Sequence, residues 1–274
     1  MFKIPAGDQI WEISSPQVMG ILNITADSFY KESRFSDIEL AVAQALLFQE
    51  QGASIIDIGG QSTRPGATLI TPEIEAKNII PFIKAIKKAL PKMLISIDTY
   101  NALVAQEALE AGANIINDIS CGNFDNSMLK VVAEFNAGYI GMHLTGNFQT
   151  MHEIEARKSI METEQLYFEN KKRELATYGI NNWVIDPGFG FGKTVEENFT
   201  LVKQLGNLRN LGLPILLGVS RKSSIYKTLG ISPSEALNGT TIVNTIGLLN
   251  GASIIRVHDV KEAKEIIQLL PLLT

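Results

Sequence analysis

Polar and ionisable side chains follow eight short apolar segments of this sequence, at the point where each segment ends. These side chains are Asn23, Thr63 with Arg64, Asp98, Asn117 with Asp118, His143, Asp186, Ser220 with Lys222, and Arg256 with His258. Turns that follow strands are commonly polar, so one or two such groups need no functional explanation. Eight of them, with acids and bases interleaved, predict a binding site for a charged substrate.

The cationic side chains of this set suit a phosphate group. Arg64, Arg256 and His258 can donate N–H hydrogen bonds to phosphate oxygens. Arg256 and His258 are two residues apart, so in a strand they would face the same side. Asn23 adds a neutral oxygen of the kind that Mg²⁺ accepts. Together they predict a diphosphate pocket that could hold Mg²⁺, although each residue taken alone could equally well serve in a surface salt bridge.

Two carboxylates and one amide form a second group. Asp98, Asn117 and Asp186 could together accept hydrogen bonds from the N–H and NH₂ edge of a heterocycle such as guanine or a pterin. Buried carboxylates need partners of this kind. The alternative is structural, because Asp98 could cap the helix that follows it and Asp186 could belong to the turn before Pro187.

The segment 218–224 (GVSRKSS) would complete a site for a flat ring and a carboxylate. Gly218 lets a ring approach the backbone, and Lys222 could contact a ring carbonyl. Ser223 stands where a helix is expected to begin, so a substrate carboxylate could rest on its hydroxyl and on the helix N-terminus. An ordinary capped helix explains the serines equally well.

The segment 186–193 (DPGFGFGK) combines conformational freedom with aromatic surface. Its glycines allow many backbone conformations, and Phe189 and Phe191 could stack on a substrate ring. It lacks the GxxxxGK[ST] spacing of a P-loop, so phosphate binding of that type is not expected.

Apolar segments alternate regularly with helical patterns along the chain. Strands are predicted over 17–23, 53–60, 93–98, 113–118, 139–143, 183–186, 214–219 and 252–257, and helices over 37–51, 71–90, 101–111, 126–136, 152–178, 195–205, 223–228, 234–250 and 260–270. Near-continuous apolar strands are typical of a parallel sheet that is buried on both faces. Eight strand–helix units without a linker predict one α/β domain over 1–274, a (β/α)8 TIM barrel. An open doubly wound sheet is the alternative, but no GxGxxG follows the first strand.

Composition narrows the class of protein further. The hydrophobic fraction is 45% and the formal net charge is -5, with no basic block, which argues against binding to nucleic acid or to a membrane surface. Cys121 is the only cysteine, so no disulfide can form within the chain and a reducing, cytoplasmic setting is expected. No signal-peptide pattern or membrane-length apolar run is present, which favours the same setting.

Eight segments together resemble the dihydropteroate synthase family, the folate-pathway enzymes that sulfonamides target. The matching segments are 19–29 (MGILNITADSF), 57–67 (DIGGQSTRPGA), 95–99 (ISIDT), 114–120 (NIINDIS), 142–143 (MH), 184–193 (VIDPGFGFGK), 216–223 (LLGVSRKS) and 252–260 (ASIIRVHDV). The resemblance implies a TIM barrel that condenses 6-hydroxymethyl-7,8-dihydropterin diphosphate with 4-aminobenzoate, giving 7,8-dihydropteroate and diphosphate. It also implies an SN1-like, Mg²⁺-assisted loss of diphosphate, followed by attack of the aryl amine.

Site residues are implied by position in the family motifs. The pterin would be held by Asp98, Asn117, Asp186 and Lys222 and lined by Ile119, Met142, Phe191 and Gly218. Diphosphate would be bound by Asn23, Thr63, Arg64, Arg256 and His258, with Asn23 near Mg²⁺. The aminobenzoate would be surrounded by Phe29, Thr63, Pro65, Phe191, Lys222 and Ser223. The implied catalytic residues are Asp98, Lys222, Arg64 and Asp186.

Two departures from the family pattern and two alternative functions accompany this interpretation. Ala26 stands where many members have proline, and Gln61 replaces the usual glutamate before Ser62. The alternatives are a pterin-binding domain of the methyltransferase type and a non-catalytic pterin-binding subunit.

Members of the family are generally homodimers that pack through late helices, which implies a homodimer here and points to the predicted helix 234–250.

Overall fold

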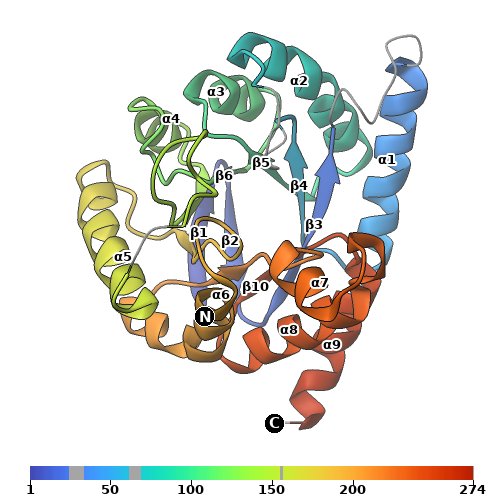
Figure 1. Cartoon of the computed structure of the whole chain (residues 1–274). Helices are drawn as coiled ribbons and strands as arrows, with labels where there is room; N and C mark the ends of the chain where they lie inside the picture. Colours follow the sequence, from blue (N-terminus) through green and yellow to red (C-terminus); the bar gives the residue numbers. More distant parts are fainter. Residues whose placement is uncertain (25–33, 62–68, 155–156, 274) are drawn as a thin grey trace.

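Eight parallel strands form a barrel in the computed structural model of the chain, which describes residues 1–24, 34–61, 69–154 and 157–273. Their order around the barrel is β8-β7-β6-β5-β4-β3-β10-β9, and a parallel bridge between Ile185 and Ile215 closes the ring (Figure 1). The bounds are β3 Gln17–Asn23, β4 Ile55–Gly59, β5 Leu94–Asp98, β6 Ile115–Asp118, β7 Gly138–Met142, β8 Val184–Asp186, β9 Leu216–Leu217 and β10 Ile254–Val257. The predicted TIM barrel is confirmed, and the open sheet is excluded.

Helices surround the barrel, one or more after each strand, as Figure 1 shows. They are α1 Arg34–Glu50, α2 Pro72–Ala89, α3 Ala102–Glu110, α4 Met128–Glu134, α5 Ile160–Thr177, α6 Val195–Gln204, α7 Ser223–Leu229, α8 Leu237–Leu249 and α9 Val260–Leu273, with short 3-10 turns at Leu205–Leu211 and Pro233–Glu235. None of the helices described is long and apolar enough to span a bilayer.

The predicted helix 152–178 is wrong in its first turns. The helix begins at Ile160, where the Ser159 side chain accepts a hydrogen bond from the Glu162 backbone N–H. An N-cap of this kind satisfies a backbone donor that lacks a partner within the helix. Residues 152–159 contain no glycine or proline, so their composition alone did not show that the helix would begin only after Ser159.

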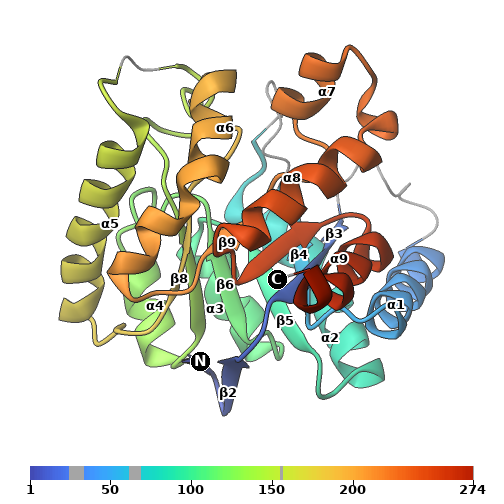
Figure 2. The same cartoon turned by 90° about the horizontal axis from the view of Figure 1, so that it is seen from below.

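A hairpin closes the N-terminal end of the barrel and was not predicted. Strands β1 Phe2–Ala6 and β2 Gln9–Ile13 pair antiparallel, and Figure 2 shows β2 and the N-terminus at the end opposite α7. Apolar residues alternate on both sides of Gly7, which has a positive φ of 73°, and that alternation is the signal that sequence reasoning missed. Trp11 and Ile4 join the apolar layer that fills the barrel: Met19, Ile55, Ile115, Ile140, Val184, Leu216 and Ile254.

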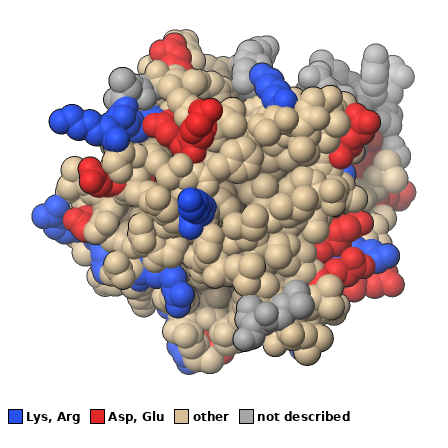
Figure 3. Space-filling view, turned by 60° about the horizontal axis from the view of Figure 1, so that its bottom comes forward, with Lys and Arg blue, Asp and Glu red and all other residues tan. Residues whose placement is uncertain are grey.

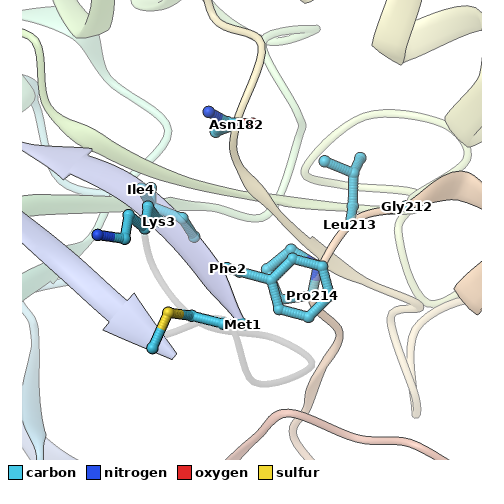
Figure 4. Close-up of a pocket in the computed structure, with 8 residues that line it drawn as sticks. All are labelled: Met1, Phe2, Lys3, Ile4, Asn182, Gly212, Leu213 and Pro214. Atoms are coloured by element: carbon cyan, nitrogen blue, oxygen red, sulfur yellow. The ribbon is translucent and has the colours of Figure 1, made fainter. Parts of the chain in front are cut away.

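A cavity of about 270 Å³ lies beside the hairpin (Figure 4). Phe2, Ile4, Leu213 and Pro214 are among its lining residues. The single charged residue of the lining, Lys3, forms an exposed ion pair with Glu12 at 2.9 Å. This cavity lies away from the polar strand ends and lacks their chemistry, so it is not a candidate for the active site.

Cys121 packs outside the barrel wall. It is fully buried and has a positive φ of 51°. Its Sγ lies where a side chain on Gly141 would project, and Trp183 closes the same space. Burial raises the pKa of the thiol, so Cys121 is held as a neutral packing residue rather than as a nucleophile.

We expect Trp11→Ala to destabilise the protein by about 3–5 kcal/mol, because it removes the largest buried side chain of the hairpin and leaves a cavity. Urea unfolding measures the loss. The matched control is Ile10→Ala on the same strand, where the side chain is 57% exposed and the change should stay within about 0.5 kcal/mol. Equal losses in the two variants would contradict this account of the hairpin.

Candidate active site

Four neighbouring strands place their ends at one level of the barrel. Asn23 pairs with Gly59, Gly59 with Asp98, and Asp98 with Asn117. Side chains alternate along a strand, and these positions share the inward face with the apolar layer below them. A Cβ on Gly59 would lie 3.7 Å from Asn23 Oδ1 and 3.6 Å from Asp98 Cβ, so the glycine leaves open the space between the two side chains. Three predicted site residues are therefore brought together.

Arg256 lies at the centre of this group. Its Nε donates to Asp57 Oδ2 at 2.6 Å and its Nη2 donates to Asp98 Oδ2 at 2.7 Å. The same Asp57 oxygen accepts from Asn117 Nδ2 at 3.1 Å. The predicted diphosphate ligand thus touches the predicted pterin carboxylate directly. Asp57 was not among the predicted site residues.

Asp186 and Lys222 form the opposite side of the site. Asp186 is 7% exposed, and its Oδ1 accepts from the Gly188 backbone N–H at 2.8 Å. A Cβ on Gly218 would lie 3.9 Å from Asp186 Oδ2, so only glycine leaves this surface flat. Lys222 Nζ donates to the Phe189 carbonyl and lies 4.7 Å from the centre of the Phe191 ring. The structure therefore brings Asp186, Gly218, Phe191 and Lys222 together as predicted.

Burial shifts the pKa values of the titratable groups at this rim. It raises the pKa of Asp98 to about 7, against the opposing charge of Arg256. It also raises the pKa of Asp186, which Lys222 opposes. Burial lowers the pKa of Lys222 to about 8, and the Asp186 carboxylate limits that fall. Near neutral pH, Asp98 and Lys222 are thus close to their titration points.

His258 and Ser223 occupy the positions that the sequence indicated. His258 Nδ1 lies 2.9 Å from Ser220 Oγ, and the His258 backbone N–H donates to the same oxygen at 3.2 Å. The hydroxyl therefore fixes the orientation of the ring. Ser223 is the first residue of α7, directly after Lys222 as its N-cap. Between Ser220 and Lys222, Arg221 has a positive φ of 53° and pairs with Asp259 at 2.7 Å and 2.9 Å, which anchors the turn.

An apolar group borders the site next to Asn117. Ile119 and Met142 are buried and cluster with Leu144 and Met151, and Phe191 packs against them. Sulfur and aromatic side chains of this kind suit the face of a flat ring. The predicted slot residues Ile119, Met142 and Phe191 thus lie in one contiguous cluster.

A buried charged cluster supports the glycine-rich loop and was not predicted. Lys193 Nζ lies 3.5 Å from Glu164 Oε1 and donates to the carbonyls of Gly188 at 3.0 Å and Phe191 at 3.3 Å. His143 Nδ1 lies 2.7 Å from the same Glu164 oxygen. His143 follows the inward-facing Met142, so its side chain turns outward to α5 and away from the site. Side chains alternate between the two faces of a strand, and this alternation could have shown that His143 points away from the site.

Four predicted residues, Phe29, Thr63, Arg64 and Pro65, lie outside the described residues, as does Ala26. Gln61 is described, and its Oε1 accepts from the Ile70 backbone N–H at 3.1 Å. This hydrogen bond therefore links Gln61 to Ile70, the residues on either side of segment 62–69.

Asn23 is the one predicted metal ligand, and its side chain is exposed at the rim. The described part of the chain contains no cluster of three or more His, Cys, Asp or Glu side chains that could hold a metal. One neutral oxygen fits Mg²⁺ that is bound mainly through substrate phosphates and water, as Mg²⁺ commonly is. Within the described ranges, Asn23 alone does not make a site that would hold a metal without the substrate.

A TIM barrel whose rim gathers paired carboxylates, an amide and cations around an apolar slot suits an enzyme that binds a pterin. Residues 19–258 match the family described as pterin binding enzymes. Dihydropteroate synthase of Synechocystis sp. is 42% identical over 227 residues, covering 82% of this chain and 78% of the relative. The enzyme of Escherichia coli K12 is 39% identical over 260 residues, covering 94% and 92%.

Solved structures agree with these relatives. The Yersinia pestis dihydropteroate synthase with a sulfonamide drug has a TM-score of 0.92 at 34% identity and covers 99% of each chain. The Xanthomonas albilineans enzyme with 4-aminobenzoic acid has a TM-score of 0.91 at 32% identity, covering 99% of this chain and 97% of that one. The chain belongs to the pterin-binding enzyme family and, within it, to the dihydropteroate synthases.

We expect kcat/KM for the pterin substrate to be bell-shaped in pH. Activity should fall below about pH 7, where Asp98 becomes protonated, and above about pH 8, where Lys222 loses its proton. Asp98→Asn should remove the acid limb and Lys222→Ala the basic limb. Each should lower the plateau by about 10- to 100-fold through loss of a charged contact, while circular dichroism shows an intact fold. Wild-type kinetics in either variant would contradict the site assignment.

Proposed function

We propose that this dihydropteroate synthase joins 6-hydroxymethyl-7,8-dihydropterin diphosphate to 4-aminobenzoate at the rim formed by Asp98, Asn117, Asp186, Arg256 and Lys222. The observation that carries the proposal is the direct contact of Arg256 with Asp98 at 2.7 Å. A phosphate-binding cation and a ring-binding carboxylate at that distance would bring the two ends of one substrate together. The reaction belongs to the family that the chain's relatives define.

The pterin ring would lie between the carboxylates and the apolar slot. Asp98 and Asp186 offer acceptors to its N–H and NH₂ groups, and Lys222 offers a donor to its carbonyl. Ile119 and Met142 supply the apolar face. Because Gly218 has no side chain, the ring can approach the backbone on the other face.

The diphosphate would lie beside Arg256, His258 and Asn23. Arg256 keeps its orientation through its two carboxylate partners, and His258 through Ser220. Mg²⁺, when bound at Asn23 and the diphosphate, would neutralise charge on the leaving group. The roles of Thr63 and Arg64 at this end, and of Phe29 and Pro65 around the aminobenzoate, stay predictions.

Loss of diphosphate leaves positive charge on the pterin methylene, and ionised Asp98 would stabilise that charge. The neutral amine of 4-aminobenzoate then forms the new C–N bond and loses a proton, so no protein nucleophile is required. Phe191 and Ser223 would border the aminobenzoate, next to Lys222. This sequence of steps is the SN1-like path that the family resemblance implies.

We expect purified protein with Mg²⁺ to release diphosphate from the pterin substrate only when 4-aminobenzoate is present, with 7,8-dihydropteroate as the second product. Coupled detection of diphosphate and chromatography of the pteroate measure the two products. Chelation of Mg²⁺ should lower the rate strongly. Methyl transfer from a methylated pterin in place of this reaction would favour the methyltransferase alternative, and pterin binding without turnover would favour the non-catalytic subunit.

The face formed by α8 and α9 supports a proposal that the enzyme works as a homodimer. Ile242, Ile246, Leu249 and Leu269 are exposed apolar residues on these helices. A groove of about 660 Å³ runs between the helices, and its lining combines Leu237, Ile266, Leu269 and Leu270 with polar residues and with the acidic Glu235, Glu262 and Glu265. Figure 3 shows a face on which uncharged residues cover much of the surface, with a Lys or Arg side chain near the centre and most other charged side chains toward the edges. Several exposed apolar residues on neighbouring helices are typical of an interface.

We expect sedimentation equilibrium to give the mass of a dimer for the native protein. Ile246→Glu should shift the equilibrium to the monomer, because it places a charge in the apolar face. Leu47→Glu, at an apolar position on α1 that is 42% exposed against 43% for Ile246, is the matched control and should leave the dimer intact. A monomeric native protein, or dissociation by the control alone, would contradict the proposed interface.

A further inference from the structure

Asp57 is a fully buried carboxylate in the middle of β4, one inward position below Gly59. Its Oδ2 accepts from Arg256 Nε at 2.6 Å and from Asn117 Nδ2 at 3.1 Å. We propose that Asp57 is a positioning residue that sets Arg256 of the diphosphate subsite and Asn117 of the pterin subsite through one shared oxygen. The inference rests on the proposed function and goes beyond it, because Asp57 itself is not expected to touch substrate.

The three residues come from separate strands, β4, β6 and β10, and their side chains meet inside the barrel. Arg256 has a second anchor at Asp98, 2.7 Å from Nη2. A guanidinium that is held at two of its nitrogens has a fixed plane, whereas a single contact would leave it free to rotate. Asp57 and Asp98 together therefore fix the plane of the guanidinium, and without Asp57 only the contact with Asp98 would hold it.

Stability alone does not explain this arrangement. A buried ion pair gains little over apolar residues of similar volume, because both charges lose their hydration. Only one oxygen of Asp57 is used, since Oδ1 has no hydrogen-bond partner among the described residues. Ser96, which faces Asp57 on β5, also lacks a partner for its hydroxyl in this part of the chain. The pairing is concentrated on the oxygen that touches the two site residues.

The charge of Asp57 also acts on Asp98. Burial raises the pKa of Asp98 and Arg256 opposes the rise, while the carboxylates of Asp57 and, to a smaller extent, of Glu75 and Asp118 add to it. A neutral side chain at position 57 should therefore lower the pKa of Asp98 and move the acid limb of the pH profile to lower pH. A role confined to folding would leave that limb unchanged.

The first test is steady-state kinetics of Asp57→Asn. We expect kcat/KM for the pterin diphosphate to fall at least about tenfold, the loss of one charge-assisted hydrogen bond, while KM for 4-aminobenzoate stays within about twofold. Ser96→Ala, a change at the same level of the barrel, is the control and should leave both constants and the acid limb unchanged. Asp118→Asn removes another buried carboxylate, one that pairs with Ser120, Gly122 and Tyr139. It should lower the melting temperature and move the acid limb less than Asp57→Asn does, because Asp118 contributes less than Asp57 to the raised pKa of Asp98.

Asp57→Glu separates position from charge and also serves if Asp57→Asn does not fold. It keeps the carboxylate but moves its oxygens by one methylene. We expect kcat/KM for the pterin diphosphate to fall as in Asp57→Asn, while the acid limb stays closer to that of the wild type. Wild-type kinetics in this variant would show that only the charge matters and would overturn the positioning role.

Double-mutant cycles identify the residues through which Asp57 acts. Asp57→Asn is combined with Arg256→Gln and, separately, with Asn117→Ala. If Asp57 acts through these residues, each double variant loses less activity than the product of the two single losses. Independent losses in both cycles, or an equal rise of KM for both substrates, would overturn the inference. A wild-type protein that fails to turn over the pterin diphosphate would instead overturn the proposed function and this inference with it.

Discussion

Arg256 reaches across the upper end of the barrel interior and pairs with carboxylates from two other strands, at 2.6 Å and 2.7 Å. This contact is possible because parallel strands of a closed barrel turn every second side chain inward. The lower inward positions are apolar and pack on the hairpin, and the upper ones carry the polar groups. A solid apolar layer therefore excludes water from below, so the ionic contacts above it lie in a medium where charge interactions are strong.

The balance of charge at the rim has a direct chemical meaning. At the rim Asp57 and Asp98 pair with Arg256, and Asp186 is opposed mainly by Lys222, so these three carboxylates outnumber these two cations. A diphosphate adds further negative charge. Such a rim can hold a pterin and stabilise a developing cation, but it needs additional positive charge to accept the leaving group. The predicted roles of Mg²⁺ and Arg64 meet that need.

The sequence allowed the fold and most of the described site to be predicted because both depend on short-range patterns. Each apolar segment ends where its strand ends, and the polar residue that follows marks the rim. Asp57 was missed because it lies inside an apolar segment, and nothing nearby indicates Arg256, 199 positions further along, as its partner. Glu164 was missed for a similar reason, since on a helix it resembles an ordinary surface residue until α5 packs against His143.

Local composition was misleading where tertiary contacts decide the outcome. Residues 152–159 have helical composition, but the Ser159 cap begins the helix later. The hairpin of β1 and β2 is too short to be stable alone, and it forms because Trp11 enters the barrel. His143 was grouped with the strand-end residues, although its neighbour Met142 already occupied the inward direction.

The packing of Cys121 against Gly141 and Trp183 has a practical consequence for solution work on the enzyme. The only thiol of the sequence is sealed behind the barrel wall in its neutral form, so alkylating reagents and oxidants can reach it only when that wall opens. The rate of thiol labelling in the native protein therefore reports the opening of β6 and β7 from their helices, without any engineered probe.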